Sequence, residues 1–317
     1  MTDRIGFFVK KPGLMTLIQD AGRFGKHGIG LTCGGPLDTL AFYWANRLLG
    51  NHNNATLLEI SFGGLTLTVN ATSQIALTGA TAPLSINGKA VSMWRSHNVK
   101  PGDEIAVGFA SEGCRSYLAV AGGFAIEPSF GSSATVVREN IGGLNGGKLE
   151  VGDFLPCVNH PHSQNHLLPE LYRPHYGRHV QLRVVLGYQQ SAFSRVQLAH
   201  FFSGEYQTTD RSDRMGYRLS GPEIKPSIDG ILSEGICHGA IQVPADGQPI
   251  VLLNDRQTIG GYPKLGSVMQ LDTGKLAQLT PGGTVTFEEV SIEDAHRINL
   301  LARQQLAAIQ LTPVDSE

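Results

Sequence analysis

The sequence predicts a mainly β protein of two domains, and three observations support this. A chain of 317 residues is longer than one hydrophobic core usually serves. Glycine contributes 39 residues, well above its usual share of about 7%, whereas charged residues make up only 16%. Short apolar or alternating segments recur between turn signals such as Asn87-Gly88. This pattern is typical of a β-barrel or sandwich, not of a βαβ fold.

The N-terminal β domain is expected at residues 1–155. A helix is predicted from Asp38, at an N-cap position, to Gly50, because Leu40, Trp44 and Leu48 recur at helical spacing. The segment 57–69 predicts two short strands or a bulge. The other strands are predicted at 5–9, 74–78, 83–86, 91–95, 104–109 and 115–121.

A Pro- and His-rich segment at residues 156–179 is interpreted as a linker, since its histidines match no standard metal-site spacing. In the C-terminal β domain, residues 180–290, a helix is expected from the cap Ser191 to Gly204. Residues 291–317 are expected to form a helix and a tail, because a capping box begins at Ser291. Strands of this domain are predicted at 180–186, 250–253, 267–271 and 284–290.

Composition excludes several classes of function. A net charge of −2 gives no electrostatic basis for binding nucleic acid or an anionic membrane. No apolar signal core and no apolar run of about 20 residues is present. The cysteines, Cys33, Cys114, Cys157 and Cys237, form no CxxC pair, so neither a zinc site nor a redox motif is indicated. We therefore expect a cytoplasmic protein.

Residues 239–264 contain the strongest signal for a binding site. The apolar run 250–253 predicts a buried strand, and the polar residues 254–258 follow it directly, before Gly260-Gly261. Polar groups at the end of a rigid strand are what a small-molecule site requires. The alternative is a strand followed by a polar turn.

A second polar segment, rich in glycine, carries Gln19, Asp20 and Arg23 close together. Such a set of donors and acceptors can contribute to a site. The alternative is that Asp20 and Arg23 only pin the loop through a charge-assisted hydrogen bond.

Eight motifs recur in a fixed order along roughly residues 13–290. They are Thr16 with Gln19-Asp20-x-Gly22-Arg23-x-Gly25, Gly34-Gly35-x-Leu37-Asp38, Ala45-Asn46-Arg47-Leu48, Leu58-Glu59-Ile60, Leu77-Thr78-Gly79-Ala80, and residues 116–123, 212–219 and 248–263. With these motifs the chain resembles the allophanate hydrolase subunit 2 or KipA-like family, also called the biotin-dependent carboxyltransferase family, which includes one of the subunits of bacterial 5-oxoprolinases. Two positions depart from the family pattern: Leu186-Gly187-Tyr188-Gln189 replaces a Pro-Gly-Pro turn, and Ile259 stands where a second threonine is common.

The resemblance implies two cyclophilin-like, β-barrel-type domains with a few short helices and a C-terminal helix. It implies a subunit of an ATP-dependent 5-oxoprolinase, which opens 5-oxo-L-proline to L-glutamate. The partners would be a KipI-like (allophanate hydrolase subunit 1-like) protein and a LamB/YcsF-like protein. One alternative is a carboxyltransferase subunit acting on urea or another amide with a separate biotin carrier. Another is a non-catalytic antagonist of a histidine-kinase inhibitor.

Two absences favour the 5-oxoprolinase interpretation. The chain has no Met-Lys-Met biotinyl-lysine site and no glycine-rich ATP-grasp signature. We therefore expect no covalent biotin on this chain. ATP and magnesium would be shared with the partner subunit, and the chain would be inactive alone.

The hypothesis for the chemistry is that the lactam oxygen attacks ATP and gives a phosphorylated imidate, which the third protein hydrolyses. Arginine and lysine would contact anions, a carboxylate would take the lactam N–H proton or hold magnesium, and glutamines would hold the amide. The alternatives are that Arg214 pairs with Asp213 and that Tyr262 only packs. The predicted catalytic residues are Asp255, Arg256, Arg214 and Glu234; the predicted substrate-binding residues are Gln242, Gln257, Thr258, Tyr262, Lys264, Gln19, Asp20 and Arg23; no metal ligand is assigned.

Overall fold

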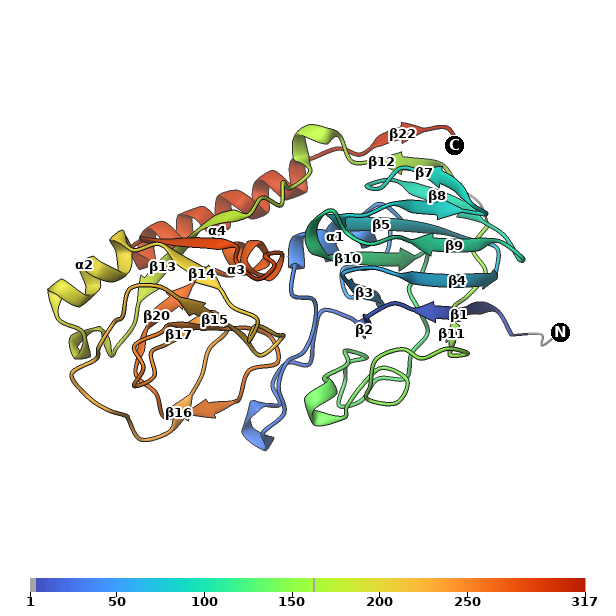
Figure 1. Ribbon diagram of the computed structural model, residues 1–317. Coiled ribbons are helices and arrows are strands. Elements are labelled where there is room, and N and C mark those ends of the chain that lie inside the picture. Colours follow the sequence, from blue (N-terminus) through green and yellow to red (C-terminus); the bar gives the residue numbers. More distant parts are fainter. Residues whose placement is uncertain (1–3, 162, 317) are drawn as a thin grey trace. The chain divides into compact units, whose positions relative to one another are not determined.

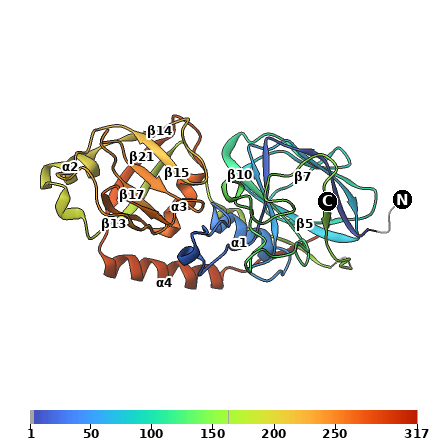
Figure 2. The same cartoon turned by 90° about the horizontal axis from the view of Figure 1, so that it is seen from below.

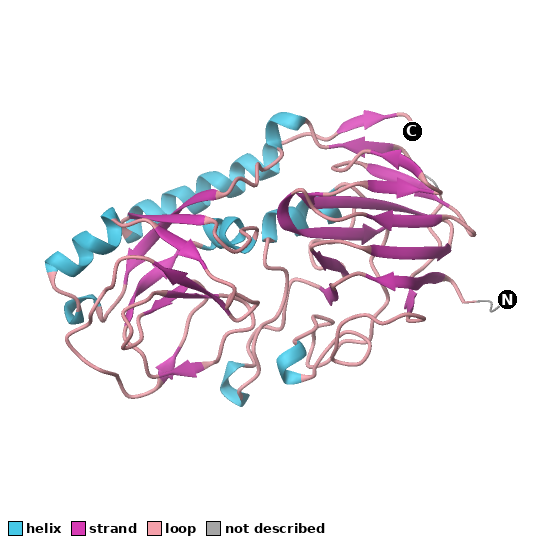
Figure 3. Ribbon diagram, in the orientation of Figure 1, coloured by secondary structure: helices cyan, strands magenta, loops and turns pink. Residues whose placement is uncertain are grey.

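The computed structural model describes residues 4–161 and 163–316 (Figure 1). The chain divides into two compact units. Unit 1 comprises the residues up to 25, residues 34–175 and those from 310 on, and unit 2 comprises residues 26–33 and 176–309. The expectation of a mainly β protein with a few short helices and a C-terminal helix is confirmed (Figure 3).

Unit 1 is built on two antiparallel sheets, ordered β11-β1-β4-β9-β6-β7 and β2-β3-β10-β5-β8. Side chains alternate along β4, so that Leu65, Leu67 and Val69 point into the core. Its strands are β1 Gly6–Pro12, β2 Met15–Gln19, β3 Leu57–Ser61, β4 Leu65–Asn70, β5 Ser73–Thr81, β6 Leu84–Ile86, β7 Lys89–Val91, β8 Ser96–Val99, β9 Glu104–Val107, β10 Glu112–Val120, β11 Phe154–Pro156, β12 Asn165–Leu167 and β22 Thr312–Val314.

The helix of unit 1 forms where its cap residue predicted it. The Asp38 side chain accepts a hydrogen bond from Ala41 N (3.0 Å), and α1 (Thr39–Arg47) follows. Its apolar face, including Trp44, is buried. Two 3₁₀ turns complete the unit, η2 (Val137–Glu139) and η3 (Glu170–Tyr172).

Unit 2 contains a closed barrel of seven strands, ordered β13-β20-β17-β18-β15-β14-β21 (Figure 2). The barrel closes because β13 pairs antiparallel with β20 on one side and parallel with β21 on the other. The strands of the unit are β13 His179–Leu186, β14 Tyr206–Thr208, β15 Gly216–Ser220, β16 Glu234–Gly235, β17 Ala240–Gln242, β18 Ile250–Leu252, β19 Ile259–Gly260, β20 Lys264–Val268 and β21 Thr284–Glu289.

Helices cover the barrel of unit 2. The helix α2 (Arg195–Ser203) packs on β21, where the Phe201 and Phe287 rings stack at 4.3 Å between centroids. The Ser291 hydroxyl caps α4 (Ile292–Ala308), as its capping box predicted. The other helices are α3 (Gln270–Ala277) and the 3₁₀ turns η1 (His27–Ile29) and η4 (Gln190–Ala192). None of the helices in the described ranges is long and apolar enough to cross a bilayer.

Three local predictions were wrong. The strand predicted at 91–95 does not form: β7 ends at Val91, and Trp94 adopts a positive φ of 61°. The strand predicted at 267–271 ends at Val268, since Asp272 accepts hydrogen bonds from the Arg183 backbone and guanidinium and fixes α3 there. The cap of α2 is Ser194, whose hydroxyl accepts from Gln197 N, because a 3₁₀ turn occupies Ser191.

The unit boundaries also differ from the expected ones. Most of the expected linker lies within unit 1, where β12 pairs with β22 near the end of the chain. Gln74 Nε2 donates to Asn165 Oδ1 (2.9 Å) and holds this segment in place. Residue 162 of the segment lies outside the described residues. Conversely, residues 26–33 belong to unit 2, although they interrupt the sequence of unit 1.

Candidate functional site

Two of the polar residues after β18, Asp255 and Arg256, are buried instead of facing solvent. β18 is buried and pairs with β15 on one side and β17 on the other. Beyond it, Asp255 and Arg256 are each only 5% exposed. Buried charged side chains need partners, so the contacts of these two decide what they can do.

Asp255 is bound by Arg214 in a bidentate ion pair. Arg214 Nε donates to Asp255 Oδ2 (2.8 Å) and Nη2 donates to Oδ1 (3.0 Å), with both residues buried. The Asp255 backbone N–H also donates to the Arg214 carbonyl (3.0 Å). Asp213, the alternative partner, accepts from Met215 N instead (2.8 Å). The pair therefore ties the turn before β15 to the turn after β18 and positions Arg256.

Arg256 is a buried cation of a different kind. Its Nε donates to the Ile236 carbonyl (3.0 Å) and its Nη1 to the Leu253 carbonyl (3.2 Å), and it interacts electrostatically with the nearby Cys33 thiol. Within the described chain, these partners include no carboxylate. Burial lowers the pKa of Arg256 below its usual value, and the nearby Cys33 and Cys237 partly offset this shift. Such a cation is suited to receive an anionic group of a ligand.

His238 lies beside this arginine. Its Nε2 donates to Asn254 Oδ1 (3.0 Å). Burial, and then the Arg256 charge, lower the pKa of His238 to about 4. The imidazole is therefore neutral near pH 7.

A second group, here called the polar cluster, comprises Gln189, Glu234, Gln242, Gly260 and Lys264. Gln242 and Lys264 face each other across β17 and β20, next to an irregularity in the pairing. Lys264 Nζ lies 2.7 Å from Glu234 Oε1, which also accepts from Gln189 Nε2 (2.7 Å). The Lys264 hydrogen bond is the main cause that lowers the pKa of Glu234. The carboxylate is therefore ionised and already engaged.

Gln242 supplies a free hydrogen-bond donor in the polar cluster. It is 3% exposed, and its Nε2 has no hydrogen-bond partner among the residues that the structure describes. The amide lies against Gly260, where a Cβ would come within 2.9 Å of Nε2. A buried donor without a partner is costly, so this amide is the best-placed group of the cluster to bind a carbonyl oxygen.

Ile236 lies between Arg256 and the polar cluster. Its carbonyl accepts from Arg256, and its side chain packs against Gly260. Its backbone N–H donates to the Thr258 carbonyl (3.0 Å), so Thr258 helps to fix this connection. Gln257 is exposed, and Tyr262 is 48% exposed with its ring at the surface.

The three predicted residues of unit 1 hold a loop together. Gln19 Nε2 donates to the Thr135 carbonyl (3.0 Å), and Gln19 Oε1 accepts from Gly35 N. Asp20 accepts from the Ser132 hydroxyl (2.6 Å) and from Ser133 N. Arg23, 1% exposed, donates to the carbonyls of residues 129, 132 and 134. These bonds connect residues 19–23 to residues 129–135.

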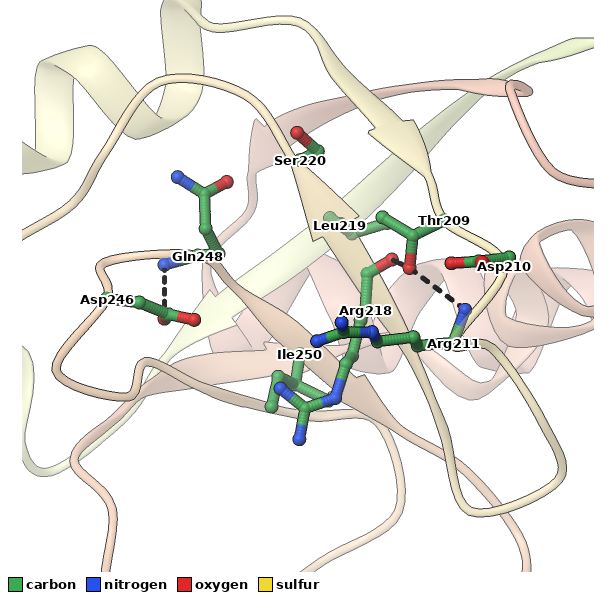
Figure 4. Close-up of a pocket in the computed structure, with 9 residues that line it drawn as sticks. All are labelled: Thr209, Asp210, Arg211, Arg218, Leu219, Ser220, Asp246, Gln248 and Ile250. Atoms are coloured by element: carbon green, nitrogen blue, oxygen red, sulfur yellow. Dashed lines mark hydrogen bonds between the residues drawn. The ribbon is translucent and has the colours of Figure 1, made fainter.

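A shallow depression of about 320 Å³ also lies on the barrel (Figure 4). Its charged side chains are all exposed and of both signs, from Asp210, Arg211, Arg218 and Asp246. The dashed contacts in Figure 4 join backbone groups to Thr209 and Asp246 side chains. It contains none of the predicted site residues, and its arginines provide surface controls for Arg256.

Sequence reasoning missed several residues of these groups. Gln189 was noticed only as a departure from a turn motif, and His27, Cys33 and His238 were assigned no role. The one available signal was the position of Cys33 directly before the Gly34-Gly35 motif. Its contact with Arg256 joins segments that are far apart in the chain, and no local pattern reveals it.

Comparison with known proteins identifies the class of domain to which this chain belongs. Residues 29–289 match the family model "Carboxyltransferase domain, subdomain A and B", so the chain belongs to this family. It is 38% identical over 296 residues to a 5-oxoprolinase subunit of Escherichia coli, covering 93% of each chain. The same subunit of Haemophilus influenzae is 36% identical over 284 residues, covering 89% of this chain and 90% of that one.

Solved structures extend the similarity to urea-processing proteins. The urea amidolyase of Kluyveromyces lactis superposes on 100% of this chain with a TM-score of 0.91 and 27% identity. This chain spans only 21% of that protein. TTHA0988 superposes on 91% of this chain with a TM-score of 0.81 and 33% identity, over 57% of its own length. The family resemblance inferred from the sequence motifs is thereby confirmed.

Proposed function

We propose that this chain is a subunit of an ATP-dependent 5-oxoprolinase that opens 5-oxo-L-proline to L-glutamate. The observation that carries the proposal is the 38% identity to a 5-oxoprolinase subunit over 93% of both chains. In the urea amidolyase relatives, by contrast, the matching part is less than a fifth of a much longer protein. The partners would be a KipI-like and a LamB/YcsF-like protein, in the cytoplasm.

The two groups of unit 2 suit the substrate, which carries a carboxylate and a cyclic amide. Arg256 lacks a carboxylate partner within the described chain and would bind the substrate carboxylate or a phosphate. Gln242 Nε2 would donate to the lactam oxygen. Lys264, held by Glu234, would add positive charge beside that oxygen.

The proposed reaction proceeds in three steps. The lactam oxygen attacks the γ-phosphorus of ATP, an O–P bond forms as the bond to ADP breaks, and the ring N–H proton is lost. One water then adds to the activated carbon, and the C–N bond opens as the ring nitrogen takes up a proton, which gives an acyl phosphate. A second water releases phosphate from it and leaves glutamate. Positioning and positive charge contribute most to such a phosphoryl transfer. Arg256 and Lys264 would supply the charge.

Magnesium does not fit these residues. The described residues contain no group of three His, Cys, Asp or Glu side chains that could hold a metal ion. The two nearby carboxylates are engaged, Asp255 by Arg214 and Glu234 by Lys264 and Gln189. We therefore derive no step through magnesium on this chain.

The proposal is tested by mixing the chain with its two partner proteins, ATP, magnesium and 5-oxoproline, and measuring glutamate and ADP. We expect glutamate only when this chain is present. Arg256→Ala should lower its formation at least about a hundredfold, the loss expected for a desolvated charge contact of roughly 3 kcal/mol. The matched control Arg218→Ala removes an exposed arginine of the same barrel and should leave the rate unchanged. Equal rates in both variants would contradict the role of Arg256.

A carboxyltransferase acting on urea or another amide is the second candidate, favoured by the TM-score of 0.91 to urea amidolyase. It requires biotin carboxylase and a biotinylated carrier as additional proteins. Carboxylation of an amide with these proteins, and no glutamate without them, would establish it. A stable complex with the KipI-like partner and no turnover in either assay would instead indicate the regulatory antagonist.

A further inference from the structure

Cys33 lies between two nitrogen bases of unit 2. Its Sγ is 3.1 Å from His27 Nε2, and it interacts electrostatically with the nearby Arg256 guanidinium. His27 belongs to η1 and Arg256 follows β18, so the two groups reach the sulfur from separate elements. The charged or titratable groups around this sulfur include His27, Arg256 and, near the arginine, Cys237 and His238.

The surroundings of Cys33 differ from those of the other thiols. Cys114 and Cys157 are buried; Cys114 Sγ accepts from Arg115 Nη1 (3.0 Å), and burial raises the pKa of Cys157 to about 11. Cys237 is exposed, with Sγ 2.9 Å from the Ser267 hydroxyl. Cys33 combines partial burial with a histidine and an arginine beside its sulfur, and such surroundings favour the thiolate, the reactive form of cysteine.

The Arg256 guanidinium is stabilised more by an anion beside it than by a neutral thiol. The guanidinium is 5% exposed and its other partners are carbonyl oxygens. A desolvated cation gains far more from an anion than from a neutral acceptor. A Cys33 thiolate would serve as the resident anion of Arg256 when no ligand is bound.

We propose that Cys33 is a modification site for hydroperoxides, with His27 and Arg256 holding its sulfur as a thiolate. The thiolate attacks one oxygen of hydrogen peroxide, an S–O bond forms and the O–O bond breaks. Sulfur is oxidised by two electrons to a sulfenic acid. The leaving hydroxide takes a proton and becomes water, so that the peroxide is reduced. A thiol reductant reverses the change. Oxidation would alter the contact of Arg256 and, on the proposed function, reduce glutamate formation.

The first test is the pH dependence of alkylation by iodoacetamide, measured for each cysteine by mass spectrometry on the full chain. A free thiol reaches half its maximal alkylation rate near pH 8.5, because about half of it is ionised at that pH. We expect Cys33 to reach half its maximal rate at a clearly lower pH than Cys237, although Cys237 is more exposed. Cys33 with the same midpoint as Cys237 or a higher one would overturn the proposal.

Variants separate the activating groups from general unfolding. His27→Ala should move the Cys33 midpoint upward by at least about one pH unit, since an imidazole partner is lost. The matched control His296→Ala removes an exposed histidine of the same unit and should change nothing. Circular dichroism checks that both variants fold. An unchanged midpoint in a folded His27→Ala chain would contradict the assigned role of His27.

The second test traps the oxidised product directly. After brief exposure to hydrogen peroxide, dimedone should label Cys33 at least about tenfold more than Cys237, and Arg256→Met should reduce this labelling. Labelling needs neither partner proteins nor substrate, so it fails or succeeds independently of the proposed 5-oxoprolinase activity. Preferential labelling of Cys237 would overturn the proposal.

Discussion

Replacing Asp255 by alanine should destabilise unit 2 rather than only abolish activity. The carboxylate accepts two hydrogen bonds from Arg214, at 2.8 and 3.0 Å, and both residues are more than nine-tenths buried. Asp255→Ala leaves the Arg214 guanidinium buried without its carboxylate. Loss of one partner of such a pair costs about 3–5 kcal/mol, a large part of the roughly 5–15 kcal/mol that stabilises a domain.

Two further variants calibrate this magnitude. Glu223→Ala breaks an exposed pair with Lys225 in the same unit, whose side chains are 59% and 67% exposed, and should cost less than about 1 kcal/mol. The double variant Arg214→Met with Asp255→Leu removes both charges and should recover most of the loss, because no buried charge remains unpaired.

The assay must report on unit 2 alone. Hydrogen exchange measured by mass spectrometry follows the amides of β15 and β18, which the Arg214–Asp255 pair connects. Both tryptophans, Trp44 and Trp94, lie in unit 1, so their fluorescence during urea unfolding provides an internal reference. Unchanged protection of β15 and β18 in Asp255→Ala, together with lost activity, would refute the structural role and favour direct catalysis.

Three other changes test the site and its framework. Gln242→Met should raise the KM for the amide substrate and leave the free energy of unfolding unchanged or about 1 kcal/mol higher, because it removes a buried donor that has no partner among the described residues. Steady-state kinetics measure the KM and urea unfolding measures the stability. An unchanged KM would count against contact between Gln242 and the substrate. The pKa of His238, about 4 in the folded chain, lies below the ordinary value of about 6.5, so protons bind the unfolded chain more readily. The contribution of His238 to stability should be complete above pH 6.5 and decline by at most about 3 kcal/mol as the pH falls to 4. Hydrogen exchange of the β17 amides measures this decline. Exchange rates that do not respond to the pH change, or that respond equally in His238→Asn, would contradict the assignment to His238. Gly239→Ala should destabilise the barrel by more than about 1 kcal/mol, because Gly239 has a φ of 79° and a Cβ there would clash with the Val268 carbonyl; a thermal midpoint equal to that of the unaltered chain would contradict this.

Much of the secondary structure could be predicted because its signals are local. Asp38 and Ser291 cap helices through side-chain bonds to amides three residues ahead. The apolar run at 250–253 forms β18. Where prediction failed, a distant partner decided the outcome, as with Asp272, which Arg183 of another element binds at the start of α3.

The candidate site divides in the same way. The stretch after β18 and its polar residues were predicted from the sequence, and so was a site built around them. The tertiary structure decides which of these groups are engaged. Asp255 is bound by Arg214 and Glu234 by Lys264 and Gln189, whereas Gln242 Nε2 has no partner among the described residues. Whether each residue binds substrate stays a prediction.

The sequence by itself determined the mainly β class and the family, because turn glycines, strand periodicity and ordered motifs are all read along the chain. The tertiary structure alone decided that residues 26–33 belong to unit 2, where Cys33 meets Arg256. Burial and pairing of charges arise only when a closed barrel brings distant segments together. Local sequence patterns therefore do not reveal which groups a buried side chain contacts, and these contacts determine what chemistry the side chain can perform.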